Sequence, residues 1–169
     1  TLTITYIAYT IPASSISTDK FTLNPHTLSY DSSNSTSAQL VYDIVNNKKI
    51  YKAQSLSLQY DITAHYFVNS PANMNNTSDY RIPYTTAISS AGVITLTLDL
   101  SLVLGFNETL QLGDFKINSA AIIGTGALNS NIYTITPSST SIIYNSEIIN
   151  IKYIGNYLVD NETTINTNS

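Results

Sequence analysis

Few side chains in this sequence are placed to carry out catalysis. Its two histidines are His26, which follows a proline in a predicted turn, and His65, which lies on the polar face of a predicted strand. No serine stands in the G-x-S-x-G pattern of hydrolase nucleophiles, and the GTG at 124–126 is not followed by a phosphate-loop Lys-Ser/Thr. The only close carboxylate pair, Asp160 and Glu162, borders a polar C-terminal stretch. The sequence therefore favours a protein that is not an enzyme, and it assigns no catalytic residue.

Metal binding has equally little support. The sequence contains no cysteine, which excludes disulfides and thiolate metal sites. Four aspartates could meet in space: Asp43, Asp61, Asp79 and Asp114. Their spacing does not match a calcium-binding loop, so carboxylates that cap turns or face water are the simpler interpretation.

One short motif with chemical meaning does recur. Five asparagines begin the N-x-[ST] pattern of N-glycan acceptors: Asn34, Asn75, Asn76, Asn107 and Asn161. All five fall in predicted loops or in the C-terminal tail, where a glycan would not disturb a core. Because Asn, Ser and Thr are so frequent here, some of these patterns arise by chance. We expect no metal or small-molecule cofactor, and covalent N-glycans on some of these residues.

Lysines and tyrosines leave two further possibilities open. Lys52, Lys116 and Lys152 lie in or beside predicted strands, where isopeptide links to asparagine could replace disulfides, but the sequence identifies no partner. The chain has 13 tyrosines and no tryptophan, which is compatible with a sugar-binding surface. Three of the tyrosines alternate with core positions, and packing is their simpler role: Tyr42, Tyr60 and Tyr66.

The composition limits the partners of this chain. Charged residues make up 11% of it, against about 25% in ordinary globular proteins, and the net charge is −4. Nucleic-acid binding needs a basic patch, which seven scattered Lys and Arg residues do not provide. No run approaches 18 consecutive apolar residues, so no membrane span is expected. The surface must consist of Ser, Thr, Asn and Tyr, which do not repel neighbouring copies electrostatically.

The sequence patterns predict that nearly all the elements that position these residues are β-strands. SLSLQYDITAHYFV at 55–68 and GVITLTLDLSLVLGF at 92–106 alternate apolar and polar residues, which predicts antiparallel sheets with one buried and one wet face. No window shows a helical period over three turns. The sequence thus predicts an all-β, antiparallel immunoglobulin-like or pilin-like β-sandwich over residues 13–160, followed by a polar tail at 161–169.

The first twelve residues, TLTITYIAYTIP, form a separate extended segment at 1–12. Leu2, Ile4 and Tyr6 lie on one face of an extended chain, and after Tyr6 the apolar set moves to the other face. Such a segment is either the first strand of its own sandwich or a donor strand that completes the sheet of a neighbouring subunit. A donor would bind through main-chain hydrogen bonds and through these three side chains. Head-to-tail contacts of that kind do not close, so they build a filament.

The opening TLTITYIAYTIP, the cysteine-free alternating strands, the uncharged composition and the scattered sequons together resemble the subunits of archaeal thread filaments. Those are glycosylated surface filaments of thermoacidophilic archaea. The resemblance implies a type-1-pilin-like sandwich, donor-strand complementation by the N-terminal segment, and head-to-tail polymerisation with identical subunits outside the cell. Adhesion or biofilm formation would be the cellular use, and the five sequon asparagines would be the glycan acceptors.

A second interpretation keeps the N-terminal strand within its own chain. The protein would then be a stand-alone cell-surface or coat sandwich, such as a carbohydrate-binding module, a surface-layer domain or a viral capsid protein. Strand order, filament symmetry and the identity of the occupied sequons do not follow from the sequence.

Overall fold

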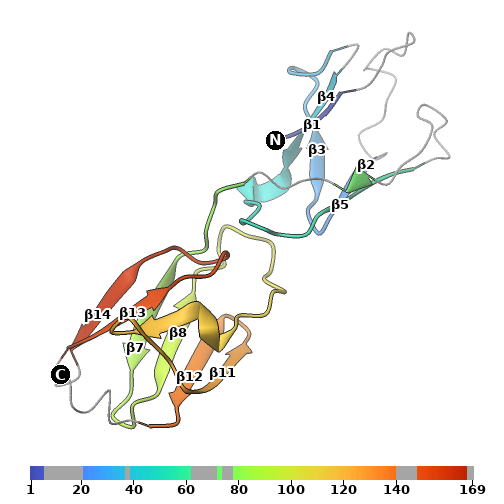
Figure 1. Ribbon diagram of the computed structural model, residues 1–169. Helices are drawn as coiled ribbons and strands as arrows, with labels where there is room; N and C mark the ends of the chain where they lie inside the picture. Colours follow the sequence, from blue (N-terminus) through green and yellow to red (C-terminus); the bar gives the residue numbers. More distant parts are fainter. Residues whose placement is uncertain (6–20, 37–38, 62–71, 74–77, 140–147, 167–169) are drawn as a thin grey trace. The chain divides into compact units, whose positions relative to one another are not determined.

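The computed structural model describes residues 1–5, 21–36, 39–61, 72–73, 78–139 and 148–166 (Figure 1). These residues form antiparallel β-sheets and two short 3-10 helices, which confirms the predicted all-β class. The chain is divided into two compact units, Thr1–Ser78 and Asp79–Ser169, which we call unit 1 and unit 2.

Unit 1 contains two three-stranded sheets of order β1-β4-β3 and β2-β5-β6. Their strands are β1 (Leu2–Thr5), β2 (Phe21–Asn24), β3 (Leu28–Tyr30), β4 (Gln39–Ile44), β5 (Ser57–Tyr60) and β6 (Ala72–Asn73), and the 3-10 helix η2 (Val45–Asn47) follows β4. Phe21 of one sheet lies 5.7 Å from Tyr42 of the other, measured between ring centroids, and 4.9 Å from Tyr60 of its own sheet. Aromatic side chains therefore join the two sheets of this unit.

Unit 2 contains two four-stranded sheets of order β11-β12-β8-β7 and β10-β9-β13-β14. Their strands are β7 (Tyr84–Ile88), β8 (Ile94–Leu98), β9 (Phe115–Ile117), β10 (Ala120–Ala121), β11 (Gly124–Asn129), β12 (Ile132–Pro137), β13 (Ile148–Tyr153) and β14 (Glu162–Asn166), and the 3-10 helix η4 (Leu112–Asp114) precedes β9. Phe115 stacks on Tyr133 of the opposite sheet at 5.0 Å between ring centroids and lies 5.1 Å from Tyr153 of its own sheet. The two sheets thus form a sandwich around a buried aromatic group.

The alternation that predicted the strand at 92–106 holds only for its first half. Ile94, Leu96 and Leu98 are buried on one face of β8, as expected. The strand ends there because the carboxylate of Asp99 accepts the backbone N–H of Ser101 at 3.0 Å and turns the chain. Continued alternation through 92–106 also predicts that Leu102 and Leu104 point inward, but these side chains are 42% and 39% exposed. That part of the prediction is wrong.

The run at 55–68 follows the predicted alternation over the residues that the structure describes. Leu56, Leu58 and Tyr60 are buried on one face, in agreement with the predicted alternation. Residues 62–68, which include His65 and Tyr66, lie outside the described residues.

The predicted domain bounds can be located on the two units. The span 13–160, predicted as one sandwich, falls partly in each unit. The predicted polar tail at 161–169 contains β14, whose Ile165 pairs with Ile149 of β13. The hydroxyl of Thr164 also donates to the side-chain oxygen of Asn150 at 2.9 Å. Threonine-rich segments form edge strands readily even with a single aliphatic residue, because β-branched side chains favour the extended chain.

Two glycines of unit 2 allow a direct test of this packing. A Cβ at Gly124 would collide with the backbone oxygen of Thr136, whereas a Cβ at Gly113 would meet nothing. We expect Gly124→Ala to lower the free energy of unfolding by about 1–3 kcal/mol, because the backbone of β11 or β12 must move. Gly113→Ala, the matched control, should change it by less than about 1 kcal/mol. Urea denaturation of both variants measures this, and equal losses would contradict the β11–β12 register.

Candidate assembly and glycosylation sites

Strand β1 lies at the edge of its sheet and pairs with β4 of the same chain. Leu2 faces Tyr42, and Ile4 faces Leu40, in an antiparallel register. Leu2 is 5% exposed and belongs to the core of unit 1, while Ile4 is half-buried against that core. Burial of a leucine side chain of this kind stabilises a fold by about 1.5–3 kcal/mol. The N-terminal strand is thus a part of the unit 1 core in this structure.

The predicted two faces of the N-terminal segment are both visible. Leu2 and Ile4 point toward the core, whereas Thr1, Thr3 and Thr5 are exposed. The hydroxyl of Thr1 lies 3.3 Å from a carboxylate oxygen of Asp43 and donates to it. The structure therefore brings together two of the three predicted donor-strand residues, and the third, Tyr6, lies outside the described residues.

The first sequon stands in a tightly hydrogen-bonded turn between β3 and β4. The carboxylate of Asp31 accepts the backbone N–H groups of Ser33 and Asn34 at 2.9 and 3.2 Å. It also accepts the side-chain amide of Asn34 at 2.6 Å. The Asn34 amide, the nearby main-chain N–H groups and the Ser33 side chain hold the pKa of Asp31 below its ordinary value, against the opposing effect of desolvation. Asn34 is exposed, but the nitrogen that a glycan would modify is already a hydrogen-bond donor to Asp31.

Two other sequons are exposed in unit 2. Asn107 lies in the loop between β8 and η4, and its sequon threonine, Thr109, is exposed as well. Asn161 is exposed directly before β14, and its backbone oxygen accepts the hydroxyl of Tyr84 at 3.1 Å. Thr163 of the same sequon pairs with Ile151 inside the sheet, so this sequon extends into a strand. Asn75 and Asn76 lie outside the described residues.

His26 has a more defined environment than its position in a turn predicted. It is 5% exposed, and its Nε2 lies 3.3 Å from the side-chain oxygen of Gln54, which is equally buried. The same oxygen accepts the backbone N–H of Tyr51 at 3.3 Å. An amide oxygen only accepts, so His26 donates through Nε2, and its buried Nδ1 has no partner among the described residues. Each of these two buried side chains gives the other a hydrogen-bond partner, and no sequence pattern predicted this contact.

The four candidate metal-binding aspartates are divided between the two units. Asp43 and Asp61 belong to unit 1 and Asp79 and Asp114 to unit 2. Within the part of the chain that the structure describes, no group of three or more metal-binding side chains occurs.

The three lysines that were candidates for isopeptide links are at least partly solvent-accessible. Lys152 is exposed, and Lys52 and Lys116 are half-buried. Lys116 stands directly opposite Lys152 in the β9–β13 pair, so neither has an amide partner at that position.

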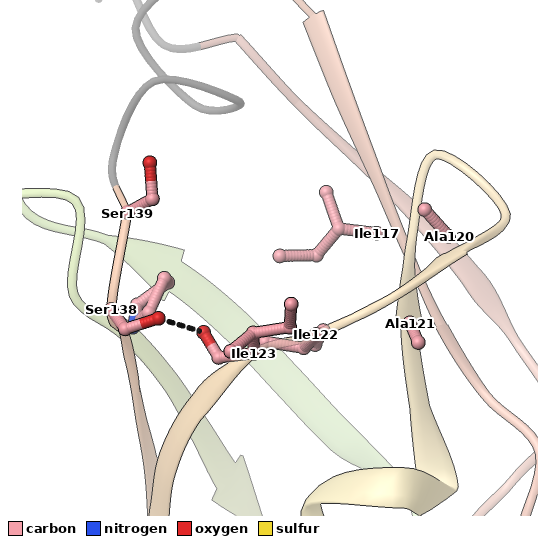
Figure 2. A pocket seen from close by; sticks show the side chains of 8 residues that line it. Ile117, Ala120, Ala121, Ile122, Ile123, Ser138 and Ser139 are labelled. Carbon is pink, nitrogen blue, oxygen red and sulfur yellow. Dashed lines mark hydrogen bonds between the residues drawn. The ribbon is translucent and has the colours of Figure 1, made fainter.

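An apolar groove of about 100 Å³ lies where the chain crosses from β10 to β11 (Figure 2). It is lined by Ile117, Ala120, Ala121, Ile122, Ile123, Pro137, Ser138 and Ser139. The hydroxyl of Ser138 donates to the backbone oxygen of Ile123 at 3.1 Å, which holds the crossover in place. The lining contains no titratable side chain. The groove can therefore accept an apolar group but supplies neither an acid nor a base.

Several tyrosine hydroxyls of unit 2 have a raised pKa. Burial is the largest cause of a raised pKa at each of five tyrosines: Tyr80, Tyr84, Tyr133, Tyr153 and Tyr157. At Tyr84, burial and the nearby Asp160 carboxylate raise the pKa to about 12. Tyr42 and Tyr60, predicted as packing residues, are indeed buried in unit 1.

No protein-family model matches the chain, and neither a curated protein nor a solved structure matches it. Among the described residues, no helix is long and apolar enough to cross a membrane.

The Tyr84 hydroxyl predicts a loss of stability in alkali. Between about pH 10 and 12 the hydroxyl loses its proton in the unfolded chain but keeps it in the folded one. The folded state then binds more protons, so the free energy of unfolding falls as the pH rises through this range. Tyr84→Phe should flatten that fall, as measured by urea denaturation at several pH values. An unchanged pH dependence in the variant would show that other groups cause the loss.

Proposed function

We propose that this chain is a structural subunit of an extracellular filament that polymerises head to tail by exchange of β1 between neighbours. The observation that carries the proposal is the pairing of β1. It is an edge strand that contributes Leu2 to the core of unit 1, and it is joined to β2 through residues 6–20. A β1 from a second copy can make the same contacts with β4 without any new surface. Exchange of an identical element is a low-cost route to assembly.

The length of the connecting segment supports such an exchange. At up to ~3.5 Å per residue, residues 6–20 could carry β1 about 50 Å from β2. The register Leu2 to Tyr42 and Ile4 to Leu40 defines which side chains a donor strand would place in the acceptor. Each subunit would give its own β1 and receive another, so the chain of contacts would stay open and extend into a fibre.

The amino-acid composition is compatible with an extracellular location of the protein. Because only 11% of the residues are charged and none is cysteine, the protein's surface changes little with pH and with oxidation. Exposed Asn34, Asn107 and Asn161 could carry glycans, which would hydrate a surface that lacks charges. Adhesion or biofilm formation is the cellular use we propose for the filament.

A stand-alone surface or coat module is the second candidate, and one observation favours it. In a single chain β1 already occupies its place beside β4, so unit 1 needs no partner to complete its sheet. The two candidates make the same contacts and differ only in whether β1 stays in its own chain. Assembly in solution therefore decides between them.

Removal of the N-terminal strand tests the exchange. We expect the full chain to form fibres in negative-stain microscopy and the chain lacking residues 1–7 to stay monomeric by light scattering. The truncated chain should bind a TLTITYI peptide, because the peptide restores the β4 pairing. A peptide with Leu2→Asp should fail to bind, since its charge would be buried. The matched Thr3→Asp peptide should still bind, because Thr3 is exposed.

The outcomes separate the two candidates. Fibres that need residues 1–7 support exchange. Full-length chains that remain monomers would favour the stand-alone module, whatever the peptide does.

Glycosylation is tested independently by intact mass. Material from the native source should exceed the 18.5 kDa of the bare chain, and Asn107→Gln should remove one glycan increment. Asn107 is the acceptor that we expect to be modified most completely, because it and Thr109 are both exposed in a loop. A mass equal to that of the bare chain would refute the glycan proposal and leave the assembly proposal untouched.

A further inference from the structure

The beginning of unit 2 is hydrogen-bonded to the segment that follows β13. Ile82 donates its backbone N–H to the oxygen of Tyr157 at 2.9 Å and accepts that of Val159 at 3.0 Å. Ile82 and Leu158 form a parallel bridge, and both side chains are fully buried. This short parallel pairing joins segments that are far apart in the sequence.

Charged and hydroxyl groups extend the pairing on both sides. The guanidinium of Arg81 donates to the backbone oxygens of Gly155 and Leu158 at 3.1 and 3.4 Å. On the other side, the hydroxyl of Tyr84 donates to the backbone oxygen of Asn161 at 3.1 Å. Hydrogen bonds to a charged donor are stronger than those between neutral groups. We call these five hydrogen bonds, with the Ile82–Leu158 bridge, the entry clamp.

The direction of the two segments decides how the entry clamp responds to tension. The contacts advance together from Ile82–Leu158 to Tyr84–Asn161, so both segments run the same way, and β7 and β14 continue them in Figure 1. Tension on the chain pulls the first segment toward the N-terminus and the second toward the C-terminus. Parallel segments pulled in opposite directions slide past each other, and all the bonds between them carry load together. Segments pulled apart from one end would instead lose their bonds one after another.

We propose that the entry clamp is a mechanical device that keeps unit 2 folded while the chain is under tension. In the proposed filament the exchanged β1 and its acceptor β4 both belong to unit 1, so tension on unit 2 would enter through the two ends of that unit and not through the exchange. The resistance itself is a property of the single chain and does not require polymerisation. Arg81 supplies two of the five bonds and is the only arginine in the sequence.

The absence of cysteine allows two loading directions to be compared in the full chain. Asp79, Asn156 and Asn161 are exposed, so cysteines at these positions can hold handles for single-molecule pulling. Handles at 79 and 161 stand at opposite ends of the clamp, just before Arg81 and at the Asn161 end of the second segment, and load it by sliding. Handles at 79 and 156 lie on the same end and peel it open. We expect the first pair to resist a markedly higher force than the second.

Arg81→Ala provides the chemical test. Under constant load through 79 and 161, the variant should unfold about tenfold faster, because two bonds to a charged donor are lost. Arg81→Lys should recover only part of the lifetime, because the ammonium keeps the positive charge but ends one bond short of the Nη1 nitrogen that donates both hydrogen bonds. Lys152→Ala, which removes an exposed cation elsewhere in unit 2, is the matched control and should not change the lifetime.

The results distinguish the clamp from the filament. Equal forces along the two directions, or an Arg81→Ala lifetime equal to that of Lys152→Ala, would overturn the clamp and leave the exchange of β1 unaffected. High force along the sliding direction in a chain that never polymerises would keep the clamp and remove the filament. If Arg81→Ala fails to fold, the comparison of the two loading directions in the unaltered background still decides.

Discussion

The packing of Phe115 between Tyr133 and Tyr153 is the contact on which the sandwich of unit 2 depends. It joins the two four-stranded sheets, and with no cysteine in the chain no disulfide can do so instead. Phe21 plays the corresponding part in unit 1, where it lies against Tyr42 of the facing sheet. Large aromatic rings bury much apolar area on one rigid side chain, so a few of them can hold the two sheets of each small unit together. The many tyrosines of this chain are compatible with a sugar-binding surface, but Tyr42, Tyr133 and Tyr153 are buried in the cores.

This way of building a core has a consequence at the sheet edges. Proteins commonly protect edge strands with lysines, prolines or bulges. Strands β1 and β11 stand at the ends of their sheet orders and contain no charged residue. An uncharged surface thus leaves edges that are open to pairing, and a chain of this composition benefits when a specific strand occupies them. Strand β1, from its own chain or from a neighbour, covers the edge of β4, and its own outer side remains the edge of the sheet.

Much of the fold could be predicted from alternation, because a buried face imposes a period of two on any strand. Leu56, Leu58 and Tyr60 and the first three inward residues of β8 followed it directly. The features that the alternation did not predict depend on single hydrogen bonds or on partners distant in the sequence. Asp99 ended β8 by capping Ser101, although the apolar pattern continued beyond it. The burial of His26 depended on Gln54, and β14 depended on β13, and neither partner is marked by a local pattern. The division into two units likewise reflects which strands pair, a property that periodicity does not encode.

The β1–β4 pairing of unit 1 and the entry clamp of unit 2 share one physical basis. The β1–β4 pairing and the entry clamp both use backbone amides and carbonyls, with a single arginine as the charged contributor at Arg81. Main-chain hydrogen bonds do not titrate over the range in which carboxylates and histidines change charge, and salt screens them little compared with surface ion pairs. A chain with few charged residues can form few ion pairs, so its stability depends more on main-chain hydrogen bonds. Their orientation then matters more than their number, because bonds aligned to share a load resist it together, whereas the same bonds loaded in sequence yield one at a time.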